Sequence, residues 1–151
     1  MKEFASINDI LDFAIIQEQE AVEFYTNLAS RMKIEAMRIV FNEFAQEEMK
    51  HKAKIIDIKE KGIYLVSSEK ISDLKISDYL VKADLGREMT YQEALVLAMN
   101  KEKAAFKLYM GLSERAPNAE LKSLFLMLAQ EESKHKLRFE IEYDDMVLKE
   151  N

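Results

Sequence analysis

The chain has 151 residues, 48% of them hydrophobic and 33% charged, which suits one globular domain and excludes a disordered chain. The formal net charge of −6 argues against a nucleic-acid partner, because a phosphate-binding surface is basic. The sequence contains no cysteine, which excludes disulfides, iron–sulfur clusters and thiolate zinc sites.

The first part of the chain predicts a helical hairpin over about residues 7–61. Ser6 followed by Asp9 is typical of a helix start, and apolar residues then recur at helical spacing in two successive runs. The second run ends before Gly62, and glycine commonly terminates helices. Because only a short turn can separate the runs, the two helices should be antiparallel neighbours.

A second hairpin is predicted over about residues 91–147. Thr90 and Glu93 have the spacing of a capping box at the start of a helix. Pro117 and Asn118 interrupt the apolar pattern and indicate the turn between the two helices of this hairpin.

The two hairpins are joined by a long crossover over about residues 62–89, which could contain a short helix at 77–83. Its length allows it to cross the whole bundle. The sequence therefore predicts an all-α fold, a four-helix bundle of two hairpins that forms a single domain over residues 1–151.

The two hairpins repeat one polar pattern at an interval of 84 residues. The repeated residues are Glu18, Glu48 and His51, then Glu102, Glu132 and His135. These residues lie on the apolar stripes of their helices, and the three members of each set should fall at about the same height, roughly 24 Å from the turn. Four buried carboxylates without a counter-charge would be prohibitively costly. Two divalent cations would neutralise them, and this donor set suits iron, manganese or zinc. The alternative is a polar set that is satisfied by other partners or faces the surface, and that was copied by duplication.

Neighbouring residues leave some choices open. Glu47 and Glu131 also lie close to the histidines, but the heptad pattern makes them solvated flanks. Tyr25 and Tyr109 lie two turns beyond the ligands of their helices. They could be aromatic core residues, or their hydroxyls could bond a ligating carboxylate.

With these residues laid out, the chain resembles the rubrerythrin and bacterioferritin branch of the ferritin-like superfamily, over nearly its whole length. The resemblance implies two iron ions, with manganese as the alternative. It also implies that Glu18 and Glu102 are terminal ligands, that Glu48 and Glu132 bridge the metals, and that His51 and His135 each supply one nitrogen. Rubrerythrins typically carry a further Glu where this chain has Ala105, and the sequence leaves open whether this departure abolishes their redox-linked metal shift. They also often append a rubredoxin-like domain, which a cysteine-free chain lacks.

The functional expectation is an oxidoreductase that reduces hydrogen peroxide or dioxygen, with electrons from an external donor protein. Two alternatives remain open: a ferroxidase or iron-binding protein with Fe(II) as its substrate, and a non-catalytic, metal-stabilised interaction bundle. The chain has neither a secretory signal nor an apolar stretch long enough to span a membrane, so we expect a cytoplasmic protein. Related bundles often dimerise, and we expect a homodimer.

Overall fold

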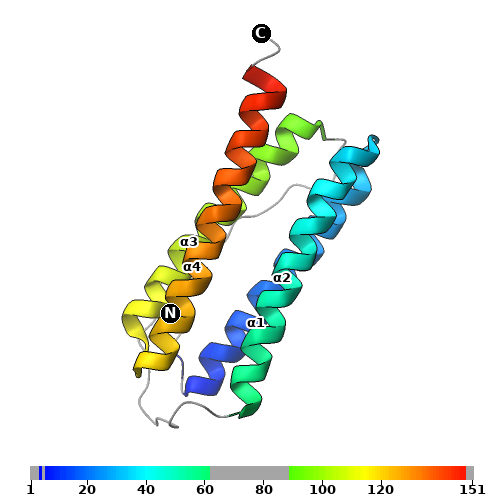
Figure 1. Cartoon of the computed structure of the whole chain (residues 1–151). Coiled ribbons are helices and arrows are strands. Elements are labelled where there is room, and N and C mark those ends of the chain that lie inside the picture. The colour runs from blue at the N-terminus through cyan, green and yellow to red at the C-terminus, as the bar shows by residue number, and fades with distance from the viewer. Residues whose placement is uncertain (1–3, 5, 62–88, 149–151) are drawn as a thin grey trace.

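A computed structural model describes residues 4, 6–61 and 89–148, and almost all of them are helical (Figure 1). The helices in this part of the chain are α1 (Ile7–Arg31), α2 (Glu35–Lys61), α3 (Tyr91–Arg115) and α4 (Ala119–Tyr143), followed by a π-helical turn, η2 (Asp144–Leu148). The all-α prediction is confirmed. The short helix expected at 77–83 lies outside the described residues.

The helix ends follow from local side-chain chemistry. Ser6 accepts a hydrogen bond from the Asp9 backbone N–H at 3.2 Å, and this satisfies one of the unpaired donors at the start of α1. Thr90 and Glu93 form the predicted capping box at the start of α3. Asn118 caps α4 by accepting from the Leu121 N–H at 2.9 Å. The starts of α1, α3 and α4 are therefore each fixed by a cap from the adjacent sequence.

The end of α4 was not predicted in detail. The helix passes directly into η2, whose first residues are Asp144 and Asp145. The last turn of α4 holds no basic residue, so no side chain of that turn offsets the negative end of the helix dipole. The change to π-type hydrogen bonding occurs at this electrostatically unfavourable end.

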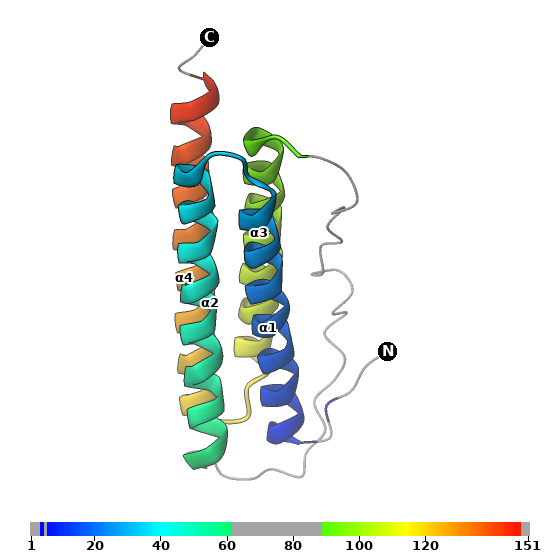
Figure 2. The ribbon, with the colours of Figure 1, turned by 90° about the vertical axis from the view of Figure 1, so that its right-hand side faces the viewer.

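The four helices pack as two antiparallel hairpins, α1 with α2 and α3 with α4. In Figures 1 and 2 the first hairpin lies against the second, with α1 beside α3 and α2 beside α4. Helices α2 and α3 run in the same direction, since α2 ends at the end of the bundle opposite to the start of α3. This is the direction expected of a ferritin-like bundle with one long crossover, and the predicted fold class is confirmed.

The core consists of two apolar clusters, one towards each end of the bundle. The first joins the starts of α1 and α4 to the ends of α2 and α3, and includes Leu11, Ile55, Leu112 and Phe125. The second joins the opposite ends of the helices, and includes Leu28, Phe41, Leu95 and Phe139. Burial of each of these side chains contributes about 1.5–3 kcal/mol, so the two clusters hold the four helices together from both ends.

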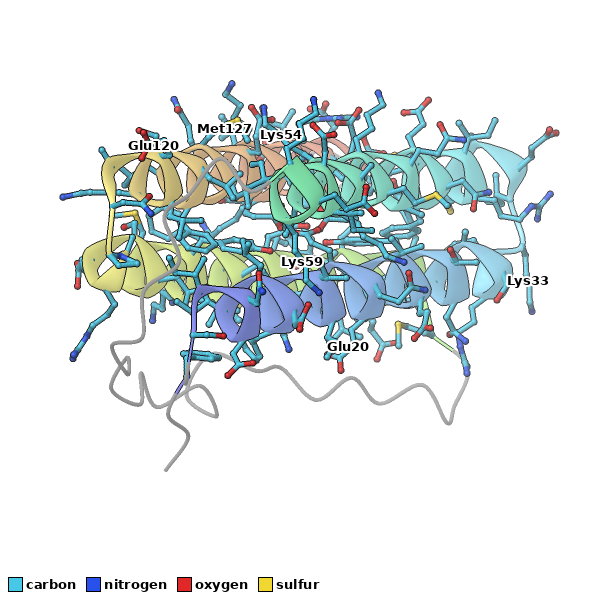
Figure 3. The ribbon with its side chains drawn as sticks, turned by 90° about the horizontal axis from the view of Figure 1, so that it is seen from below. Glu20, Lys33, Lys54, Lys59, Glu120 and Met127 are labelled. Carbon is cyan, nitrogen blue, oxygen red and sulfur yellow. The ribbon has the colours of Figure 1, made fainter. Side chains whose placement is uncertain are left out.

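Charged side chains cover the outside of the bundle. Figure 3 shows Glu20, Lys54 and Glu120 directed away from the interior, and all three are exposed. Among the described helices, none is both long enough and apolar enough to cross a membrane.

Candidate metal centre

A layer of buried polar side chains separates the two apolar clusters. Each of its six members is at most 7% exposed to solvent. They are Glu18 of α1, Glu48 and His51 of α2, Glu102 of α3, and Glu132 and His135 of α4. All six residues that the sequence singles out as ligands are thus brought together inside the bundle. They reach one layer because each helix carries its polar residues midway along an otherwise apolar stripe.

The six residues form two overlapping groups. In each group the potential ligand atoms lie within 4.8 Å of one another. One group contains Glu18 and His51, the other contains Glu102 and His135, and both include Glu48 and Glu132. The shared carboxylates therefore stand between two places where a metal ion could be held.

The histidines make reciprocal contacts between the repeats. His51 Nδ1 lies 3.0 Å from an oxygen of Glu132, and His135 Nδ1 lies 3.2 Å from an oxygen of Glu48. Each nitrogen also lies near the terminal carboxylate of its own hairpin, at 3.7 Å for Glu18 and 3.6 Å for Glu102. The two imidazole rings are nearly parallel, with centroids 5.7 Å apart. The site is therefore close to two-fold symmetric, as the sequence repeat implies.

Each of the six side chains has one buried atom that no hydrogen bond satisfies within the described part of the chain. These atoms are Glu18 Oε2, Glu48 Oε1, His51 Nδ1, Glu102 Oε2, Glu132 Oε1 and His135 Nδ1. An unsatisfied buried polar atom costs about 1–3 kcal/mol, and more if the group is charged. Because all six are oxygen or imidazole nitrogen donors directed into one layer, they fit bound metal ions of the iron, manganese and zinc type.

The carboxylates perturb one another strongly when no cation separates them. Burial, followed by the charges of the neighbouring glutamates, raises the pKa of Glu48 and of Glu132 well above the ordinary value of 4.5. Burial alone would lower the pKa of His51, but Glu18 and the other acidic neighbours raise it overall. The metal-free site therefore retains protons, and a metal ion must displace them in order to bind.

The two tyrosines are buried core residues that also bond the ligand layer. Tyr25 donates its hydroxyl hydrogen to Glu102, and Tyr109 donates to Glu18. Each tyrosine thus holds the terminal carboxylate of the other hairpin. Burial and the adjacent carboxylate raise the pKa of both hydroxyls well above 10.0, so they remain proton donors at neutral pH. Tyr25 and Tyr109 are therefore aromatic core residues and also hydrogen-bond donors to the buried carboxylates, so both interpretations left open by the sequence are correct.

The flanking glutamates lie outside the layer. The side chains of Glu47 and Glu131 are 37% and 35% exposed, and they pair with Lys50 and Lys134 on the helix surface. Their position one residue before the buried glutamate turns them by about 100° around the helix, away from the bundle interior.

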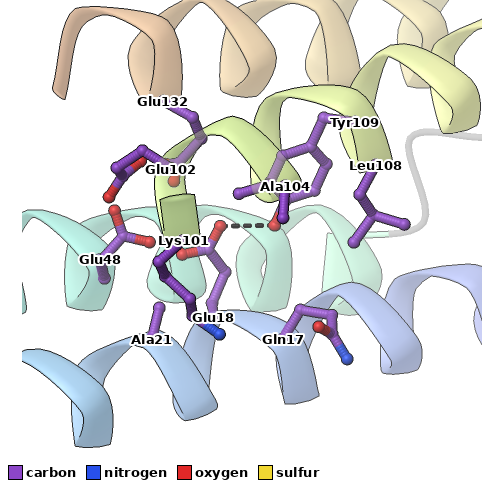
Figure 4. Close-up of a pocket in the computed structure, with 11 residues that line it drawn as sticks. Gln17, Glu18, Ala21, Glu48, Lys101, Glu102, Ala104, Leu108, Tyr109 and Glu132 are labelled. Carbon is purple, nitrogen blue, oxygen red and sulfur yellow. Dashed lines mark hydrogen bonds between the residues drawn. The ribbon is translucent and has the colours of Figure 1, made fainter. Parts of the chain in front are cut away.

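A cavity that sequence reasoning missed leads to this layer. It has a volume of about 30 Å³ and touches all four carboxylates. Its remaining lining residues are Gln17, Ala21, Lys101, Ala104, Ala105, Leu108 and Tyr109, all from α1 and α3. Figure 4 shows the carboxylates of Glu48, Glu102 and Glu132 directed towards one another at its inner end. In the sequence, only the small residues one turn after each α1 and α3 glutamate hint at this opening.

A ferritin-like bundle with one glutamate on each of two helices and Glu-x-x-His on each of the other two is the architecture of the diiron-carboxylate class. The family model described as Rubrerythrin matches residues 9–80 and 93–151. The chain therefore belongs to the rubrerythrin family.

Two solved structures are similar to this chain. A hypothetical protein from Pyrococcus furiosus has 26% identity and a TM-score of 0.63, and the match covers 89% of this chain and 85% of that one. A protein from Thermotoga maritima, described as a ferritin-like diiron-carboxylate protein, has 22% identity and a TM-score of 0.68, with coverage of 95% and 97%. The second likeness supports the fold alone. None of the curated proteins compared with this chain matches it.

Proposed function

We propose that this protein is a di-iron carboxylate oxidoreductase that reduces hydrogen peroxide or dioxygen. The observation that supports the proposal is the pair of overlapping ligand groups, each within 4.8 Å and sharing Glu48 and Glu132. A single metal ion would leave one group unused. Two ions would engage all six buried atoms that otherwise have no hydrogen-bond partner.

In this proposal Glu48 and Glu132 would help to hold both ions, because only they belong to both groups. Glu18 with His51, and Glu102 with His135, complete the two ligand sets. Two ferrous ions would supply one electron each, and together with two protons this balances the reduction of one hydrogen peroxide to two water molecules. Four carboxylates around the ions favour the oxidised, more positive state.

The surrounding residues prepare the site for a small oxidant. Tyr25 and Tyr109 orient the terminal carboxylates and keep their own protons, since the pKa of each is raised. The cavity of about 30 Å³ has room for about two water molecules. Dioxygen or hydrogen peroxide, each with two oxygen atoms, fits such a space, whereas an organic substrate does not.

The test is metal stoichiometry after anaerobic loading with Fe(II), followed by separate exposure to peroxide and dioxygen. We expect two irons per chain and rapid oxidation, with peroxide the faster oxidant. Glu132→Gln should lose most of the bound iron, and Glu131→Gln is the matched control because it removes the same charge one residue away, outside the layer. Fewer than one iron per wild-type chain would refute the proposal.

A second candidate is a ferroxidase that oxidises Fe(II) as its substrate. The observation in its favour is the near-symmetric six-residue set, in which Ala105 supplies no further carboxylate. Sustained oxidation of added Fe(II) without a donor protein would favour this candidate. Two bound metals that react with neither oxidant would instead favour the metal-stabilised interaction bundle.

The remaining expectations belong to the same proposal. Iron is the proposed metal, and manganese would point to a dismutation of peroxide. Reconstitution with candidate donors would test for an external electron-donor protein. Cell fractionation would test the cytoplasmic location, and sedimentation would test the homodimer.

A further inference from the structure

The mouth of the cavity carries a positive charge, although its inner end is acidic. Lys101 of α3 is half-buried there, one residue before Glu102. Figure 4 shows its side chain reaching from α3 towards α1, beside Ala21 and Glu18. Its ammonium group lies 5.6 Å from the centroid of the Phe24 ring, a contact that holds the charge in place. A solute that enters the cavity between α1 and α3 comes close to this group, because Lys101 lines the cavity.

The two repeats differ at this point. Gln17 occupies the position equivalent to Lys101, and Leu108 occupies the position equivalent to Phe24. The cavity is lined by Leu108 and Tyr109, whereas Phe24 and Tyr25 do not line it. On one side of the mouth the ammonium group of Lys101 packs against Phe24, whereas the equivalent residues of the other repeat, Gln17 and Leu108, are neutral. The ligand layer is symmetric, but the way into it is not.

We infer that Lys101, held against Phe24, is a specificity-determining residue that disfavours the uptake of dications through this mouth. An ammonium group repels Fe²⁺ and exerts no net force on neutral peroxide or dioxygen. The four carboxylates behind it would otherwise attract any dication. With this charge in place, small neutral molecules reach the metal pair more readily than further dications do. The inference rests on the proposed function in that the cavity leads to a metal pair.

The consequence is kinetic, because a charge at the rim of a site changes association rates more than final affinity. The test follows the uptake of Co(II), which absorbs visible light when bound, by metal-free full-length protein in a stopped-flow instrument. Lys101→Gln installs the residue that the first repeat carries at position 17. Repulsion of a divalent ion by a single nearby charge is worth several-fold, so uptake by this variant should be about fivefold faster at low salt.

Two further variants separate this effect from a general change in charge. Lys103→Gln removes the same charge from an exposed position on α3 that does not line the cavity, and it should change the uptake rate by less than about twofold. Lys101→Arg keeps the charge and should keep uptake slow. The advantage of Lys101→Gln should also shrink in about 1 M salt, where the screening length falls to about 3 Å. The amount of Co(II) bound at equilibrium should be equal in all four proteins.

The possible failures are distinguishable. If wild-type protein binds no Co(II), both the metal centre and this inference fail. If it binds Co(II) but Lys101→Gln takes it up at the wild-type rate, or no faster than Lys103→Gln, the metal centre stands and the role of Lys101 is refuted.

Discussion

Replacing one shared carboxylate should stabilise the metal-free protein while abolishing metal binding. Glu48 is 1% exposed, and in both ligand groups its carboxylate lies within 4.8 Å of other glutamates. Two charges at that separation repel each other by about 3.5 kcal/mol at an effective dielectric constant of about 20. Proton uptake relieves part of this repulsion. We therefore expect Glu48→Gln to raise the free energy of unfolding of the metal-free protein by about 1–3 kcal/mol at pH 8.

The assay is thermal unfolding with and without metal. A gain of about 2 kcal/mol corresponds to an unfolding midpoint roughly 5 °C higher for a chain of this size. Added Mn(II) should raise the unfolding midpoint of the wild type, because it binds only the folded state. It should leave the unfolding midpoint of Glu48→Gln unchanged, because this variant no longer binds the metal. Glu47→Gln is the matched control, since it removes the same charge from the helix surface and should behave as wild type. A metal-free Glu48→Gln that melts below the wild type, or one that still binds two metals, would refute the reasoning.

Three other outcomes are expected. The raised pKa values of Glu48 and Glu132 mean that these carboxyls stabilise the metal-free fold by holding protons. The stabilisation by the two carboxyls is complete below their ordinary pKa of 4.5 and is lost as pH rises through their raised pKa. The pKa of His51 is also raised, so its contribution to stability is likewise lost as pH rises above 6.5. Unfolding midpoints of the metal-free protein should therefore fall as pH rises above about 5, and a rising curve would contradict this account. Tyr109→Phe removes a hydroxyl that donates a hydrogen bond to a ligand carboxylate. We expect the metal affinity, measured by competition with a chelator, to be about 10–100-fold lower. An unchanged affinity would contradict this role. Thr90→Ala breaks a capping box far from the ligand layer. Denaturant titration should show a loss of about 1 kcal/mol, and a loss of bound metal would show that the two regions are coupled after all.

The fold was predictable because its signals are local. Ser6 and the pair Thr90 and Glu93 each act within one helical turn, so their hydrogen bonds depend only on nearby sequence. The turn at Pro117 follows from the missing backbone N–H of proline. What escaped prediction was the π-helical end of α4, where no glycine and no basic residue marks the termination.

The candidate site was predictable in its members because a helix fixes which residues share a face. Glu48 and His51 are three residues apart, as are Glu132 and His135, so each pair projects from one side of its helix whatever the tertiary context. Placing a carboxylate on an apolar stripe predicts its burial. The choice of Glu48 over its neighbour Glu47 needed only this pattern.

The contacts between repeats were decided by the tertiary structure. Tyr25 bonds Glu102 and Tyr109 bonds Glu18, across 77 and 91 residues of sequence. No spacing rule within one helix selects these partners, because they depend on how the two hairpins are rotated and shifted against each other. Packing of the two apolar clusters sets that arrangement.

The sequence by itself determined four helices, several of their ends, and a set of six polar residues repeated on apolar faces, since helix geometry and the cost of burying charge act on neighbouring residues. Only the tertiary structure decided that a cavity opens between α1 and α3, that Lys101 lies at its mouth against Phe24, and that the mouth is asymmetric. Cavities are what packing leaves unfilled. A cavity depends on how side chains from several helices pack together, and the sequence of one helix does not determine that packing.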